Sequence, residues 1–353
     1  MTNQGFTTLP SEETAEPAHV TVVHHAHPSN TLWSDFSAWY HAAPEEMETV
    51  DCGIALISDL GRNGFNVVCV PARNIDDEPD YASAIIDRAQ KRGMRVLVDI
   101  GATTVERGGH LALTDETAIR VVQHWLDAGA SGIELGADRV TDESAYRHSG
   151  LDLRLFQDYL AQYYPDAMLS LGFIADEEKE MISRIRTDLT HVVRTYRIDY
   201  AITAENIQRR MLNRFRSFEK CGVIPSWDLS GAALNALSGD IRSNGMLQAM
   251  LAFPGVLHLD RRAMMMTPSV RHGLRLRHTH RLASKSLAID NGLADRGIIS
   301  LFIDPFEVRL NFGPEIDAVA NDGRVVSSSR IELPSQGNDL LIPPGDVAWI
   351  IRR

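Results

Sequence analysis

The chain has 353 residues, of which 44% are hydrophobic and 23% charged, the balance of a globular protein with a large core. Its formal net charge of −12 disfavours nucleic acid and anionic membranes as partners, because both repel an acidic surface. No apolar run approaches the ~18 residues of a membrane-spanning helix, and three cysteines without a pairing pattern fit free thiols in a reducing cytoplasm.

The chain begins with a polar, Pro-containing stretch, which predicts a disordered tail over residues 1–18. From residue 19 onward, short apolar runs alternate with longer amphipathic stretches. Several runs are almost continuously apolar, which is typical of parallel strands covered on both faces. They predict strands at 19–25, 65–71, 95–100, 132–135, 167–172, 191–197, 223–228 and 255–260.

The stretches between these runs have helical periodicity, and several of them begin with Asp or Ser and end at Gly. Examples are DYASAIIDRAQKRG (80–93), DETAIRVVQHWLDAG (115–129) and ENIQRRMLNRFRSFEKCG (205–222). Eight strands with intervening helices predict a (β/α)8 TIM barrel over residues 19–296.

After residue 296 the pattern changes to alternating residues and turns without a helical period. Examples are GIISLFID (297–304), EVRLNF (307–312) and DLLIPPGDVAWIIRR (339–353). This pattern of alternating residues and turns predicts a small C-terminal antiparallel β-sandwich domain over residues 297–353.

Four segments, spread over most of the chain, match the pattern of a known family: VVHHAHPSN (22–30), AQKRGMRVLVDIGATT (89–104), WLDAGASGIELGAD (125–138) and MLQAMLAFPGVLHLD (246–260). In order and spacing they resemble the first-, third-, fourth- and eighth-strand regions of the α-amylase-type glycoside hydrolases. The last helix and the terminal β segment resemble the end of that family's chain. The resemblance implies the same barrel and C-terminal sandwich.

The family's retaining mechanism uses a nucleophilic Asp after the fourth strand and a general-acid Glu after the fifth, on either side of the glycosidic bond. The resemblance places Gly136 at the nucleophile position and Phe173 at the acid position, and neither side chain can perform that step. On the same comparison Asp99 and the stabilising acid Asp228 are retained, while Glu134 replaces an Arg and Trp227 replaces a His.

The connection after the third strand is also short, since only residues 101–114 separate it from the next helix. The family usually inserts a small domain there, so the resemblance implies a barrel without this domain. Among relatives, the combination is most similar to the glycosidase-like heavy chains of amino-acid transporters, whose membrane helix this chain lacks.

The resemblance therefore implies a catalytically inactive, cytoplasmic relative that acts as a binding, regulatory or assembly subunit. Its partners would be a protein, a second copy of the chain or a small saccharide, and no cofactor is expected. Phe173 and Trp227 are expected to fill the former pocket, because aromatic side chains bury a large apolar area. Asp99 and Asp228 should then form hydrogen bonds within the protein, for which Thr103, Thr104 and His27 are candidate partners.

Two alternatives stay open. A divergent active hydrolase could use Glu134 or Asp138, although Asp138 also suits a helix cap. A metal-dependent hydrolase could use His25 and His27, which alternate on one predicted strand, with a carboxylate such as Asp228. His25, His27, Asp138 and Asp228 are accordingly the candidate binding residues.

Overall fold

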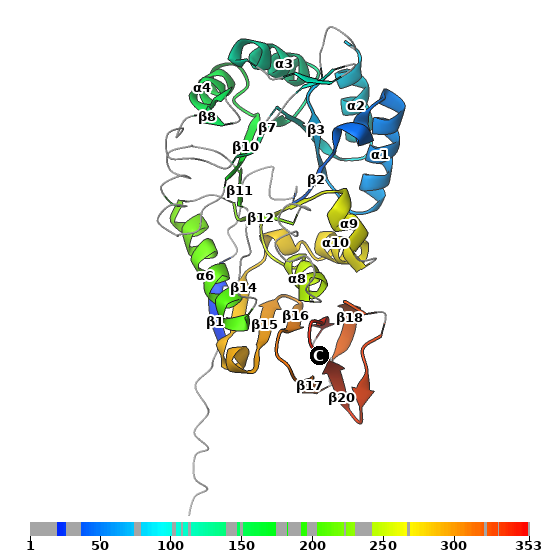
Figure 1. Ribbon diagram of the computed structural model, residues 1–353, viewed down its shortest axis with the longest axis vertical. Helices are drawn as coiled ribbons and strands as arrows, with labels where there is room; N and C mark the ends of the chain where they lie inside the picture. Colours follow the sequence, from blue (N-terminus) through cyan, green and yellow to red (C-terminus); the bar gives the residue numbers. More distant parts are fainter. Residues whose placement is uncertain are drawn as a thin grey trace, which may run out of the picture.

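A curled parallel sheet of eight strands forms the centre of the molecule (Figure 1). This computed structural model describes residues 20–25, 37–73, 79–100, 104–106, 109–111, 114–138, 147–148, 151–173, 182, 192–195, 203–221, 224–229, 242–266, 269–320, 323–330 and 332–351. The strands are β2 (Ala38–His41), β3 (Val67–Pro71), β4 (Arg95–Asp99), β7 (Gly132–Asp138), β10 (Met168–Phe173), β11 (Val192–Thr195), β12 (Ser226–Asp228) and β13 (Val256–Leu259).

The order of these strands follows the chain, as in a barrel, with each strand beside its predecessor. The sheet runs β11-β10-β7-β4-β3-β2-β13-β12, and every pair in it is parallel. Its two end strands, β11 and β12, are neighbours in space, but no ladder of hydrogen bonds joins them in the described part of the chain. The predicted α/β class and seven of the eight predicted strands are therefore confirmed.

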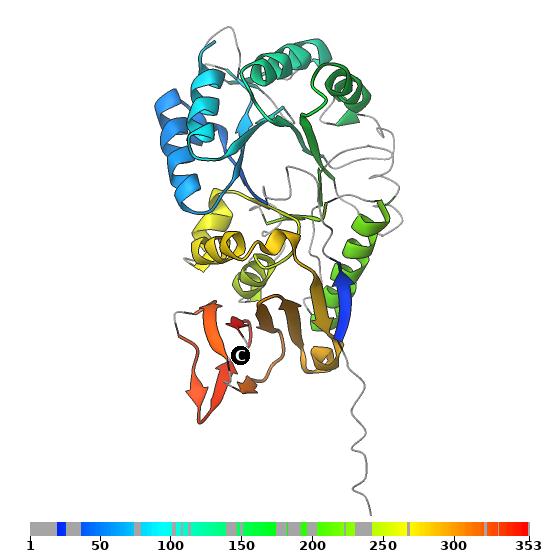
Figure 2. The same ribbon diagram turned by 180° about the vertical axis from the view of Figure 1, so that it is seen from behind.

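Helices cover the outer face of this sheet (Figures 1 and 2). In α3 the sequence reason is plain: the Thr114 hydroxyl accepts the Thr117 N–H at the first turn, and Val121, Val122 and Trp125 recur at helical spacing and are buried. The helices are η2 (Pro44–Met47), α1 (Val50–Arg62), α2 (Tyr81–Gln90), α3 (Asp115–Asp127), α4 (Leu153–Tyr163), α6 (Ala204–Cys221), α8 (Arg242–Met250), α9 (Arg261–Met266) and α10 (Ser269–Thr279).

Two antiparallel sheets lie beside this parallel sheet, and they are formed mostly by the C-terminal part of the chain. Helices α6 and α8 lie between the larger antiparallel sheet and the parallel sheet. The larger sheet has the order β1-β14-β15-β16-β21-β18, and the smaller has the order β17-β20-β19. Val319 and Leu340 of the smaller sheet share an apolar cluster with Ile350 of the larger one. The bounds are β1 (Val20–His24), β14 (Leu287–Asp290), β15 (Ile298–Ile303), β16 (Phe306–Asn311), β17 (Asp317–Ala320), β18 (Arg324–Ser328), β19 (Ser335–Gln336), β20 (Asp339–Ile342) and β21 (Val347–Ile351). The short helix η3 (Leu282–Ser284) precedes β14, and η4 (Asn291–Arg296) lies between β14 and β15.

The prediction that residues 19–25 form the first barrel strand is wrong. Strand β1 exists, but it pairs antiparallel with β14 at the edge of the larger antiparallel sheet, and Val20 and Val22 are about half exposed. An apolar, β-branched run predicts a strand and not the sheet that it joins. The first parallel strand is instead β2, a run of four residues, AWYH, too short to show a period.

Antiparallel pairing thus involves strands on both sides of residue 297, and the division of the chain into units at 297 stays a prediction. The predicted tail over 1–18 lies outside the described residues. Within the part of the chain that the structure describes, no helix is both long and apolar enough to cross a membrane.

Candidate functional site

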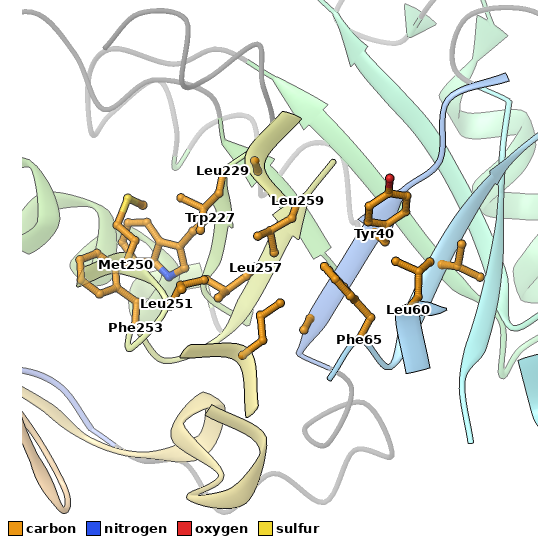
Figure 3. Packing of buried hydrophobic residues seen from close by; sticks show 14 of the residues in the cluster. Tyr40, Leu60, Phe65, Trp227, Leu229, Met250, Leu251, Phe253, Leu257 and Leu259 are labelled. Atoms are coloured by element: carbon orange, nitrogen blue, oxygen red, sulfur yellow. The ribbon is translucent and has the colours of Figure 1, made fainter. Parts of the chain in front are cut away.

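Alternation along the strands decides which side chains enter the curled sheet. On β12, Trp227 lies on the outer face, where its ring contacts Phe215 and Phe253 at centroid distances of 4.9 and 5.1 Å. Figure 3 shows the Trp227 ring directed toward Met250, the last residue of α8, and toward Phe253, which follows that helix. Because successive strand residues point to opposite faces, Ser226 and Asp228 lie on the inner face.

The same reasoning places a polar layer on the inner face, above an apolar floor. On β7, Ile133 and Leu135 join the outer core, so Glu134 points inward. Asp99 and Ser170 are its register partners on β4 and β10 and share that face. The floor beneath consists of Trp39, Val67, Cys69, Leu97, Met168 and Val256.

The carboxylates of this layer differ in their access to solvent. Glu134 is fully buried and Asp228 is 4% exposed, whereas Asp99, the last residue of β4, is half-buried. The Ser170 hydroxyl is also fully buried, and no hydrogen bond reaches it in the described part of the chain. The active sites of barrel enzymes lie at the carboxyl ends of their parallel strands. We therefore call this end of the sheet, where β2 ends at His41, β4 at Asp99 and β12 at Asp228, the mouth.

A chain of three side chains crosses the inner face near the mouth. The Ser226 hydroxyl lies 2.7 Å from Nε2 of His258, and Nδ1 of His258 lies 2.9 Å from Nε2 of His41. Ser226 and His258 are fully buried, whereas His41 is half-buried. The Cys69 thiol lies 3.9 Å from the same His41 nitrogen. Both nitrogens of His258 are thereby engaged, one on each side of the ring.

The predicted site residues on β4, β7 and β12 all lie at this end of the sheet, where β3, β2 and β13 separate β12 from β4. Asp99, Glu134 and Asp228 share the inner face, as their strand positions require. Asp138 ends β7 and lies opposite Phe173, which ends β10. Gly136 lies within β7, and the side chains of Asp138 and Phe173 lie outside the described part of the structure.

Trp227 does not fill the mouth, and that prediction is wrong. Its side chain is 1% exposed on the outer face, and its indole N–H donates to the Pro254 carbonyl at 2.9 Å. The alternation Ser-Trp-Asp separates Trp227 from Asp228 by the thickness of the sheet. The sequence contains this alternation, but it does not say which face becomes the interior.

Of the two histidines predicted at the mouth, His25 is not found there. His25 follows β1, is exposed, and its backbone N–H donates to Glu219 of α6 at 3.3 Å, so it belongs to the antiparallel region. His27 lies outside the described residues. Among the residues that the structure describes, no group of His, Cys, Asp and Glu side chains could hold a metal ion. The histidine that does end the first parallel strand is His41, which the sequence analysis missed.

The connection between β4 and α3 contains a short hairpin of β5 (Thr104–Glu106) and β6 (Gly109–Leu111). A second hairpin, β8 (Arg147–His148) and β9 (Leu151–Asp152), precedes α4. Of the predicted partners for the acids, Thr104 begins β5 and Thr103 lies outside the described residues. The hydrogen-bonding roles expected of both threonines stay predictions.

Known proteins resemble this chain in structure but not in sequence. No protein-family profile and no curated protein matches the chain. Among solved structures, Eubacterium rectale Amy13B superposes with a TM-score of 0.63 at 11% identity, over 92% of this chain and 97% of that chain. A protein described as a family GH13_31 enzyme gives a TM-score of 0.64 at 9% identity, over 91% and 100%.

A noncanonic maltogenic α-amylase, AmyB from Thermotoga neapolitana, gives a TM-score of 0.56 at 10% identity over 90% of this chain and 96% of that chain. Identities this low relate the folds and carry no information about substrate or activity. The chain therefore has the fold of α-amylase-family glycoside hydrolases.

Proposed function

We propose that this chain is a catalytically inactive glycoside-hydrolase-type protein that binds a small saccharide at the mouth. In this proposal the parallel sheet closes as a (β/α)8 barrel without the inserted domain, and the protein acts in the cytoplasm as a binding, regulatory or assembly subunit. One observation carries the proposal. The β7 carboxylate with a described side chain, Glu134, is fully buried, and the position that matches the family's nucleophile is Gly136.

The chemistry explains why this observation matters. A retaining glycosidase needs one carboxylate within bonding distance of the anomeric carbon and a second that protonates the leaving oxygen. Glu134 presents no exposed surface to a sugar in this structure, and a glycine has no nucleophile to offer. Asp228, at 4% exposure, is the retained stabilising acid of the resemblance, and a stabilising group without its nucleophile performs no displacement.

The test is turnover and binding measured on the same protein. We expect no release of nitrophenol from aryl α-glucosides and α-galactosides, and no cleavage of maltotriose, above a blank without protein. Asp228→Asn should not change that result, and calorimetry should detect a saccharide among maltose, maltotriose, melibiose and trehalose. Turnover that disappears in Asp228→Asn and survives in Asp87→Asn, a matched change at an exposed residue paired with Lys91, would contradict inactivity.

Asp228→Asn should also leave folding intact. The amide keeps the size and one acceptor oxygen of the carboxylate, so we expect the free energy of unfolding to change by less than about 1 kcal/mol. Urea unfolding followed by far-UV circular dichroism measures the change. A loss of several kcal/mol would mean that the charge of Asp228 is structural.

A second candidate, a divergent active hydrolase, is favoured by the position of Asp138. This residue ends β7 opposite the end of β10, at the edge of the sheet where barrel enzymes place their catalytic groups. If Asp138 or Glu134 were a nucleophile, an activated fluorosugar would leave a covalent adduct on one of them, visible by peptide mass spectrometry. An unmodified mass across a panel of such reagents would count against this candidate.

A further inference from the structure

A cavity of about 470 Å³ lies at the end of the parallel sheet opposite the mouth. Arg95, the first residue of β4, lines it together with Ser131 and Ala167, which directly precede β7 and β10. These three strands are parallel, so they lead away from the cavity and end at the mouth. The cavity is therefore separate from the candidate site described above, and its size suits a small molecule.

Two helices end at this cavity with their carboxyl termini. Leu126 and Gly129, at the end of α3, and Tyr163 and Tyr164, at the end of α4, belong to its lining. The two helices lie side by side in both views of the molecule (Figures 1 and 2). The carboxyl end of a helix carries a partial negative charge, because its last carbonyl groups have no partner within the helix. Both helices thus favour a cation in the cavity.

The two tyrosines at the end of α4 are held in place by their neighbours. The Tyr159 ring lies 5.1 Å from the Tyr163 ring and 5.8 Å from the Tyr164 ring, measured between centroids. The Tyr164 hydroxyl donates to Asp127 of α3 at 2.5 Å. This hydrogen bond, and then burial, raise the pKa of Tyr164 above its usual 10, so its phenol is neutral at physiological pH. Tyr163 is 58% exposed, so its ring is accessible to a ligand.

The charges around the cavity also favour a cation. Asp166 belongs to the lining and is exposed, and Asp127 lies beside it at the Tyr164 hydroxyl. Arg95 offsets one of these two carboxylates, so the described charged groups at the cavity retain a net negative charge. The formal net charge of the whole chain is −12. An anion is therefore a poorer ligand for this cavity than a cation.

We propose that this cavity is a binding site for a small organic ammonium ion, with the rings of Tyr163 and Tyr164 and the carboxylate of Asp166 around its charge. A cation over the face of an aromatic ring is attracted by the negative potential of the π electrons, and alkylated ammonium groups are recognised in this way. The methyl or methylene groups of such an ion find apolar contacts at Leu126 and Pro165. The inference goes beyond the proposed function and does not depend on it.

Calorimetric titration with choline chloride and with tetramethylammonium chloride, in a buffer of low ionic strength, tests the proposal. We expect saturable binding to the wild type, and no such signal with sodium chloride. Tyr163→Leu should weaken binding by about fivefold or more, whereas Tyr163→Phe, which keeps an aromatic face, should bind within about twofold of the wild type. Circular dichroism checks that the variants fold.

The carboxylate is tested by a matched pair of substitutions. Asp166→Asn should weaken the binding of choline, because it removes a negative charge from the cavity lining. Asp158→Asn removes the same charge from an exposed position on α4 that does not belong to the lining, and should bind choline like the wild type. Equal weakening by both variants would reduce the effect to general attraction by the acidic chain and overturn the site.

Three other results would overturn the proposal: no saturable binding of either ammonium ion by the wild type, equal affinity of the wild type and Tyr163→Leu, or tighter binding of benzoate than of choline. The saccharide titrations separate this proposal from the proposed function. Any saccharide that binds the wild type at the mouth should bind Tyr163→Leu with the same affinity, since the two sites lie at opposite ends of the sheet. Loss of one kind of binding leaves the other intact.

Discussion

Arg277 of α10 is a buried cation whose replacement should lower the stability of the protein substantially. It is 1% exposed, and its guanidinium donates to three backbone carbonyls, those of Leu251 at 3.1 Å, Phe253 and Gly255. These carbonyls lie between the end of α8 and the start of β13, where helical acceptors have lost their intrahelical partners. Burial lowers the pKa of Arg277 to about 9, so the group is still charged at neutral pH.

The magnitude follows from two opposing terms. Hydrogen bonds from a charged donor contribute about 1.5–3 kcal/mol each, so three amount to roughly 5–9 kcal/mol. Burying the guanidinium costs several kcal/mol, which Arg277→Met recovers. We therefore expect Arg277→Met to lower the free energy of unfolding by about 2–5 kcal/mol. Arg277→Lys should recover little of it, because a single ammonium has no planar fork to span three carbonyls.

Equilibrium unfolding in urea at pH 7, followed by tryptophan fluorescence and circular dichroism, measures these differences. Arg275→Met is the matched control, since Arg275 is exposed on the same helix and should change stability by less than about 0.5 kcal/mol. Equal stability of Arg277→Met and Arg275→Met would refute the idea that the guanidinium holds this turn together.

Two further predictions concern backbone space and alkaline pH. Gly255 has φ +92°, and a Cβ there would meet the Pro225 carbonyl oxygen at 2.0 Å, so Gly255→Ala should cost more than about 3 kcal/mol in urea unfolding. Gly93→Ala, at φ +69° with nothing within 4 Å of its Cβ, should cost only about 1–2 kcal/mol; similar losses at both sites would contradict the steric argument. Burial, and then its 2.7 Å hydrogen bond to Glu46, raise the pKa of the Tyr40 phenol above its usual 10. The Tyr40 phenol therefore contributes its full stabilisation of the folded state below pH 10 and loses it above pH 10, because the phenol of the unfolded chain ionises first. The difference in the free energy of unfolding between wild type and Tyr40→Phe should accordingly shrink above pH 10. A gap that widens there would contradict this sign.

The sequence by itself determined the local elements. The run VVCVP predicts a buried strand because all five residues are apolar, and β3 is buried throughout. The capping Thr114 and the spacing of Val121, Val122 and Trp125 predict α3 in the same way. Local signals suffice here, because a helix stripe or a strand face is set by residues a few positions apart.

Tertiary structure alone decided which sheet a strand joins and which of its faces is inside. The run at 20–24 is rich in β-branched residues, as a barrel strand would be, yet it pairs with β14, about 270 positions away in the chain. Alternation on β12 separates Trp227 from Asp228, but only the packing of Phe215 and Phe253 against Trp227 turns Asp228 inward. His41 and His258 meet because β2 and β13 pair, so a hydrogen bond between distant residues leaves no mark in the sequence near either one.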